Sequence, residues 1–101
     1  MLLKIDEARY LGSYQFHVRF NDGRSGTVNV RPLMDTGPGS VFAVLADENI
    51  VKQFTLQYGT LCWPGELDVA PEYLYFLAFQ NDPTLQDQFI AWGYVEQPVR
   101  T

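Results

Sequence analysis

Apolar and polar residues alternate along much of the first third of the chain, which is the period of a β-strand. The cleanest alternation lies at 14–20, where tyrosine, phenylalanine and valine are separated by glutamine, histidine and arginine. Residues 2–11 alternate less regularly, and 26–30 alternate again. The Asn-Asp-Gly-Arg run at 21–24 supplies a turn, because glycine tolerates the positive φ that a tight hairpin needs. The pattern predicts a three-stranded antiparallel meander with one solvent-facing side.

A loop, short helices and a second hairpin are predicted next. Residues 32–40 contain two prolines and two glycines, which break regular structure. Ser40 can cap a short helix, and 47–53 can hold a further helical turn. Strand-like residues at 54–58 and 61–63 flank a turn that contains glycine. The apolar faces are expected to consist of Val41, Val44 and Leu45 in the helix and of Phe54, Leu56 and Tyr58 in the hairpin.

Two helices are expected at the end of the chain. Pro71 suits the first position of a helix, where its missing N–H costs nothing, and this helix is expected to reach Gln80. Pro83 starts a second helix by the same logic, and Gly93 ends it. Strands first and helices last, with a small helical insert, predict an α+β fold. The length of 101 residues fits a single domain over 1–101.

Charge is distributed unevenly along the sequence. The chain has 12 acidic and 7 basic residues, and residues 53–99 contain six carboxylates with no lysine or arginine. A surface without cations cannot neutralise phosphates, so direct nucleic-acid binding by this half is not expected. An acidic, aromatic-rich surface suits a basic protein partner or a second copy of the chain.

The single cysteine, Cys62, excludes an intramolecular disulfide and a cysteine-based zinc site. Its place in a short strand indicates an inert, at least half-buried thiol. The N-terminus becomes charged too early for a secretory signal, and no apolar run approaches the ~20 residues that span a bilayer. We therefore expect a cytoplasmic protein that does not contact a membrane.

The first C-terminal helix has bulky apolar residues on nearly all sides. A helix at the surface of a small domain normally buries one stripe, so the remaining sides of 73–79 must be covered. The cover can be the following helix, a second copy in a homodimer, or a different protein. The residues of the following helix that would pack there are Leu85, Phe89 and Trp92.

The Trp-Pro-Gly-Glu-Leu-Asp-Val-Ala-Pro-Glu-Tyr-Leu-Tyr run at 63–75 resembles the end motif of the family called domain of unknown function 2442. The upstream hairpin at 20–23, the segment 28–33 and the strand that begins at Phe54 are also similar to that family. The resemblance covers roughly residues 1–75, which leaves 76–101 as a C-terminal helical extension.

The resemblance implies a small bacterial fold more than an activity. Members resemble accessory proteins encoded beside another small protein, in arrangements similar to toxin–antitoxin pairs. Some relatives carry a C-terminal helix-turn-helix that would bind DNA. The helix expected at 83–92 in this chain has no lysine or arginine, so it would be a very weak recognition helix.

Three carboxylates lie close together in the motif: Glu66, Asp68 and Glu72. Asp68 is expected to cap the following helix, because Ala70 offers no side-chain acceptor. No histidine accompanies these carboxylates, and their spacing matches neither an EF-hand nor a zinc motif, so no metal or cofactor is expected. His17 is expected on the solvent-facing side of the meander.

The preferred function is a non-enzymatic interaction module that binds a cognate small protein, as in a toxin–antitoxin-like pair. Its partner surface would combine aromatic anchors with acidic steering groups. The anchors are expected to be Trp63, Tyr73, Tyr75, Phe76 and Trp92, and the steering groups Glu66, Asp68 and Glu72.

Two other functions stay open. A pocket near Trp63, Cys62 and Asp68 would indicate a small-ligand-binding protein or an enzyme. A DNA-associated regulator would act through the meander, although acidic residues alongside leave that half of the chain neutral. The arginines available for it are Arg9, Arg19, Arg24 and Arg31.

Overall fold

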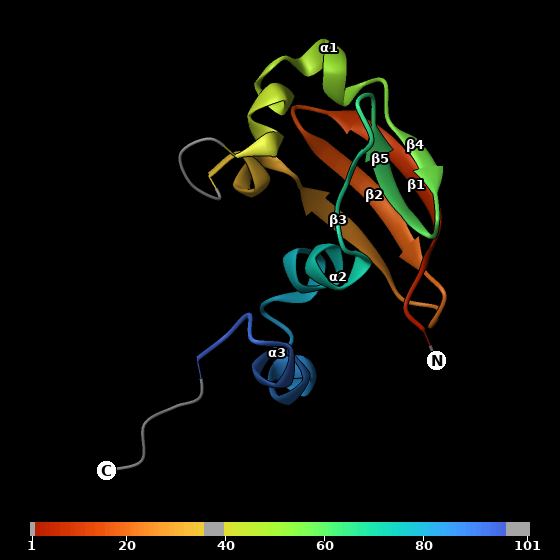
Figure 1. Ribbon diagram of the computed structural model, residues 1–101. Coiled ribbons are helices and arrows are strands. Elements are labelled where there is room, and N and C mark those ends of the chain that lie inside the picture. Colours follow the sequence, from red (N-terminus) through yellow and green to blue (C-terminus); the bar gives the residue numbers. More distant parts are fainter. Residues whose placement is uncertain (1, 36–39, 97–101) are drawn as a thin grey trace.

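The computed structural model describes residues 2–35 and 40–96 (Figure 1). Its first part is an antiparallel sheet in the order β1 (Ile5–Gly12), β2 (Gln15–Phe20) and β3 (Ser25–Asn29). The predicted meander is therefore confirmed. One side of this sheet is fully buried along β2 through Phe16, Val18 and Phe20.

A register shift explains the irregular alternation at the start of the chain. Ile5 pairs with Phe20, but the next pair joins Glu7 to Arg19, which leaves one extra residue in β1. Such a bulge moves the following side chains to the opposite face. A strict period of two, applied to the sequence, therefore assigns the residues after the bulge to the wrong face of the sheet.

The insert consists of 3₁₀ helices η1 (Arg31–Asp35) and η2 (Val41–Ala46), followed by α1 (Glu48–Val51). The Ser40 hydroxyl accepts a hydrogen bond from the Phe42 N–H, so the predicted cap is confirmed. The predicted apolar face of this helix is correct at Leu45, which is buried, but wrong at Val41 and Val44, which are exposed. In a 3₁₀ helix residues three apart share a face, so Phe42 and buried Leu45 turn inward together.

The loop predicted at 32–40 is wrong at 32–35, because these residues belong to η1, and residues 36–39 of that loop lie outside the described residues.

A second antiparallel sheet contains β4 (Thr55–Gln57), β5 (Thr60–Trp63) and β6 (Leu67–Asp68) in that order. The predicted hairpin is present, and β6 is an additional strand. The second sheet packs across the first sheet (Figure 1), with the Phe16 ring 4.9 Å from that of Phe54.

The C-terminal part forms α2 (Pro71–Phe79), the short 3₁₀ helix η3 (Pro83–Leu85) and α3 (Gln86–Trp92). Gly93 ends α3 with φ of 85°, the left-handed conformation that favours glycine. Figure 1 shows α2 between the first sheet and α3. Phe79 contacts the sheet, with its ring 5.9 Å from that of Phe20. Within the described ranges, every helix is too short or too polar to cross a membrane.

A candidate protein-binding hollow on the second sheet

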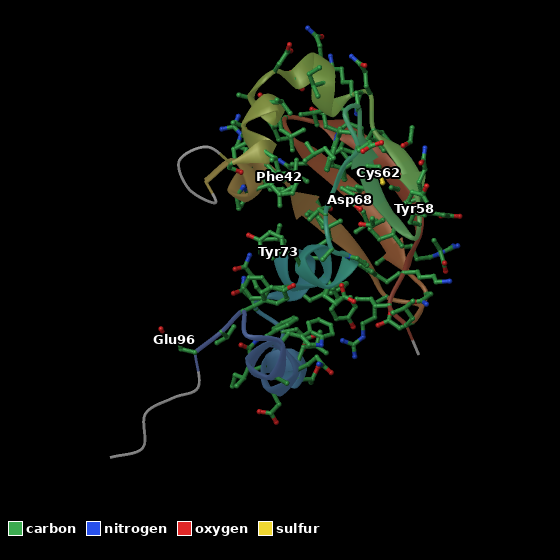
Figure 2. All side chains as sticks on the ribbon, viewed as in Figure 1. Phe42, Tyr58, Cys62, Asp68, Tyr73 and Glu96 are labelled. Atoms are coloured by element: carbon green, nitrogen blue, oxygen red, sulfur yellow. The ribbon has the colours of Figure 1, made fainter. Side chains whose placement is uncertain are left out.

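The outer side of the second sheet carries an open hollow of about 600 Å³. Strand register places Thr55, Cys62 and Asp68 in one row across β4, β5 and β6, on this side of the sheet. Trp63 and Leu67 form the next pair of β5 and β6; both are buried and also border the hollow. Alternation along the strands therefore gives the sheet an apolar face toward the core and a polar face toward the hollow. Figure 2 shows the labelled side chains of this sheet.

Two turns form the rims of the hollow, and each holds a non-glycine residue at positive φ. Tyr58 has φ of 56° and is followed by Gly59 at 76°, in the two-residue turn between β4 and β5. Glu66 has φ of 60° after Gly65 at 87°, in the turn between β5 and β6. A residue with a Cβ atom in this region costs roughly 1–2 kcal/mol. The fold therefore keeps two unfavourable backbone conformations beside the hollow.

Tyr58 is the most exposed large hydrophobic side chain of the described residues, at 90% of its full accessible area. It has no ring contact or side-chain hydrogen bond in the described structure. Sequence alternation placed Tyr58 on a face with Phe54 and Leu56, but only Phe54 packs against the core. The expected apolar face of this hairpin is therefore wrong at Leu56, which is exposed, and at Tyr58, because β4 ends at Gln57 and the chain turns.

The hollow is negatively charged. Glu66 and Asp68 both line it and are exposed, and no lysine or arginine is among its lining residues. Lys4 packs its methylene groups beside Gly59 but is not part of the lining and forms no described ion pair. A positively charged group that enters the hollow therefore meets two carboxylates without competition from the lining.

Cys62 also lines the hollow, and its surroundings favour the protonated thiol. Burial raises its pKa, and the negative charge of Asp68 raises it further. The thiolate is the nucleophilic form, so these surroundings make Cys62 a poor nucleophile. His17 lines a different hollow, beside Arg9 and Leu56, and does not meet Cys62. The described residues contain no group of three or more histidine, cysteine or carboxylate side chains that could hold a metal.

Two of the expected aromatic anchors belong to the core. Trp63 is 3% exposed, and its Nε1–H donates to the Val51 carbonyl oxygen over 3.1 Å. Tyr75 is 5% exposed, and its hydroxyl donates to Asp22 Oδ2 over 2.7 Å. Burial, followed by the hydrogen bond to the Asp22 carboxylate, raises the pKa of Tyr75 to about 12. Both rings are therefore part of the core of this fold.

The other anchors pack against each other where α2, α3 and the segment after α3 meet. The Phe76 ring lies 5.1 Å from that of Phe89 and stacks on Tyr94 at 5.3 Å. Tyr73 and Trp92 also contact Tyr94, at 5.4 and 6.2 Å. Tyr73, Phe76 and Trp92 are half-buried as a result. The cover of the aromatic helix was expected to be the following helix, a second copy or a different protein. These contacts are made by the following helix and by Tyr94 of the same chain.

The three acidic residues of the motif lie in two different places. Glu66 and Asp68 line the hollow, whereas Glu72 lies in the first turn of α2, where a carboxylate interacts favourably with the helix dipole. The predicted capping role of Asp68 is wrong: Ala70 is the cap of α2 and no side chain bonds there. Asp68 belongs to β6 instead, and its pairing with Cys62 places it on the face of the sheet that carries the hollow.

Three of the four arginines considered for DNA binding are engaged within the chain. Arg19 pairs with Glu7 at 3.3 Å, and Arg24 lies 3.8 Å from Asp82. The guanidinium carbon of Arg31 lies 4.8 Å from the centre of the Tyr14 ring. The solvent-facing side of the meander therefore offers few free cations for phosphates.

Tyr58 was missed by sequence reasoning as a site residue. The available signal was a tyrosine directly before glycine in a two-residue hairpin turn, where asparagine, aspartate or glycine is usual.

The fold and the hollow define a small α+β domain with an acidic hollow on its second sheet. The family model described as "Protein of unknown function (DUF2442)" matches residues 5–80, and the chain belongs to this family. The match contains both sheets and α2, and α3 follows it. Comparisons with curated proteins and with solved structures give no match.

Proposed function

We propose that the chain is a non-enzymatic interaction module that binds a basic surface of a cognate small protein, in an arrangement similar to a toxin–antitoxin pair. The observation that carries the proposal is the hollow on the second sheet, which Glu66, Asp68 and the exposed Tyr58 line together, without a lysine or arginine in the lining. Exposed aromatic area beside unopposed carboxylates suits a partner that supplies cations.

The chemistry of the hollow favours binding over catalysis. A cysteine enzyme needs a thiolate and a base within hydrogen-bonding reach. Here the Cys62 Sγ atom lies 3.6 Å from the Gln57 carbonyl oxygen, and its raised pKa keeps the proton on sulfur. The histidine of the chain lies at the other hollow. The remaining polar groups can hold a ligand but give no nucleophile and base pair.

The test is recovery of the partner from the native cell with a tagged chain, followed by mass spectrometric identification. A Glu66→Lys/Asp68→Lys double variant reverses the charge of the hollow and is expected to lose the partner. An Asp87→Lys/Glu96→Lys double variant changes the net charge equally at exposed positions on α3 and after it, and is expected to keep the partner. Equal capture by both variants, or no specific protein with the wild type, would contradict the proposal.

Association kinetics give an independent measurement once the partner is known. Steering by Glu66 and Asp68 predicts an association rate that falls steeply with ionic strength. The charge-reversed hollow should lose that dependence. An association rate that does not respond to salt would remove the acidic residues from the recognition step.

Small-ligand binding is the second candidate, because the hollow lies at Trp63, Cys62 and Asp68, and its volume falls in the range of ligand sites, about 300–1,000 Å³. A ligand site of this kind would hold a small organic cation. Recovery of a bound small molecule by native mass spectrometry, with no protein captured by the tagged chain, would favour it over the interaction module.

A further inference from the structure

Tyr58 occupies a position that costs stability, and among the described residues its side chain gains neither a ring contact nor a hydrogen bond in return. Positive φ at both Tyr58 and Gly59 is the pattern of a type I′ hairpin turn, whose first position favours asparagine, aspartate or glycine. Burial of a ring normally offsets an unfavourable backbone conformation, but this ring is 90% exposed. Figure 2 labels Tyr58 near Cys62 and Asp68, with which it lines the hollow.

The turn between β1 and β2 provides an internal comparison. Ser13 and Tyr14 also have positive φ, at 52° and 66°, so this turn has the same backbone pattern. The Tyr14 hydroxyl donates to the Ala46 carbonyl oxygen over 2.7 Å, and the Arg31 guanidinium lies over its ring. Contacts within the chain therefore account for the tyrosine in the first turn but not for Tyr58.

A carboxylate completes the arrangement at the first turn. A hydrogen bond from Tyr10 is the main cause that lowers the pKa of Glu48, and the positive charge of Arg31 contributes. The Tyr10 hydroxyl donates to Glu48 Oε1 over 2.6 Å and accepts from the Tyr14 N–H over 3.1 Å, so this carboxylate lies in the same hydrogen-bonded group as the turn. The first turn thus has an aromatic ring, a guanidinium over it and a carboxylate nearby. The hollow on the second sheet has the ring of Tyr58 and the carboxylates of Glu66 and Asp68, but its lining has no guanidinium.

We propose that Tyr58 is the recognition residue of the hollow, and that its ring and the carboxylates of Glu66 and Asp68 receive an arginine side chain from the partner protein. This inference rests on the proposed function and names the chemistry of the partner. Arginine fits better than lysine because its planar guanidinium stacks on an aromatic face and pairs with a carboxylate through two parallel hydrogen bonds.

The key variant is Tyr58→Asn, because asparagine before Gly59 is a preferred type I′ pair. This variant is expected to melt no lower than the wild type, so a loss of binding cannot be attributed to unfolding. Tyr58→Phe is the matched control, because it keeps the aromatic face and removes only the hydroxyl.

The binding probe is a short glycine–serine peptide that carries arginines, with the same peptide carrying citrulline as the uncharged control. Binding is followed through backbone amide chemical shifts in nuclear magnetic resonance spectra. The arginine peptide is expected to shift the amides of Thr55, Gln57 and Cys62, and citrulline should abolish these shifts. Tyr58→Asn should weaken binding by about tenfold, whereas Tyr58→Phe should stay within about threefold.

Unshifted amides around the hollow, or equal affinity of the wild type and Tyr58→Asn, would overturn the inference. The proposed function is decided separately by capture of the cognate protein. Capture that depends on Glu66 and Asp68 but is equal for wild type and Tyr58→Asn would support the function and overturn the role of Tyr58. Failure of the wild type to capture any protein would contradict the function, and the peptide titration would still decide the inference.

Discussion

Replacement of Phe89 by alanine tests whether α3 is an integral part of the fold. Phe89 is fully buried, and its ring lies 5.1 Å from that of Phe76, 6.4 Å from that of Tyr75 and 6.2 Å from that of Trp92. Removal of a buried phenylalanine ring typically costs about 3–5 kcal/mol, from lost transfer energy and the cavity that remains. A domain of this size is stable by about 5–15 kcal/mol in total. Phe89→Ala should therefore remove a large part of the free energy of unfolding.

The measurement is urea unfolding followed by tryptophan fluorescence and far-ultraviolet circular dichroism. Trp92 reports on the interface between α2 and α3, and Trp63 reports on the core between the sheets. For Phe89→Ala, we expect fluorescence and circular dichroism to give the same single transition, with its midpoint at a lower urea concentration than in the wild type. The melting temperature should fall by more than about 10 °C. Gln88→Ala is the control, because Gln88 precedes Phe89 in α3 and is exposed; its cost should stay within about 0.5 kcal/mol.

A loss below about 1 kcal/mol for Phe89→Ala would refute the reasoning. It would mean that α3 does not cover α2 in solution, and that the rings of Tyr73 and Phe76 need another cover. An early fluorescence transition that does not coincide with the circular dichroism transition would have a narrower meaning: α3 would dock on α2 without being part of the cooperative unit.

Three further effects follow from individual contacts. Because the pKa of Tyr75 is raised from 10.0 to about 12, the folded state holds this proton more tightly than the unfolded chain; the stabilisation is complete below pH 10 and is lost as the pH rises toward 12. The loss should reach at most about 3 kcal/mol in alkaline unfolding curves, and Tyr75→Phe should remove that pH dependence, whereas an unchanged curve would exclude the Tyr75 hydroxyl as its source. Gly59→Ala should destabilise by about 1–2 kcal/mol, because φ is +76° and the new Cβ would lie 2.9 Å from Lys4 Cγ; chemical denaturation measures this, and no loss would contradict the turn geometry. Tyr58→Asn should gain about 0.5–1 kcal/mol in the same assay, and a clear loss would argue against the type I′ assignment.

Local signals in the sequence predict most of the secondary structure. Proline at positions 71 and 83 marks the start of a helical segment in each case, and Gly93 marks an end, because these residues act through their own backbone geometry. Alternation along β2 predicts the buried side of the first sheet, since no bulge interrupts that strand. The acidic character of the region around Asp68 is also a property of composition and persists in the structure.

The misassigned features depend on contacts or geometry that a residue pattern does not carry. Leu67–Asp68 is a strand only because it pairs with β5, and two residues are too few for a period. The faces of η2 follow from three residues per turn instead of 3.6. The cover of α2 by α3 was one of three arrangements that the apolar pattern allowed, and only the ring contacts of Phe89 distinguish them.

The location of Tyr58 affects how binding energy would be obtained. An aromatic ring on a two-residue hairpin turn is held by a backbone with little freedom, and tyrosine has only two side-chain torsions to fix, so little entropy is lost when a partner arrives. A ring on α2 would first have to leave its contacts with Phe89 and Tyr94. The aromatic helix is therefore better suited to stabilise the scaffold, and the strained turn is better suited to recognition. On this argument a variant that weakens α3 should lower stability before it lowers affinity, whereas variants at the turn should change affinity at constant or increased stability.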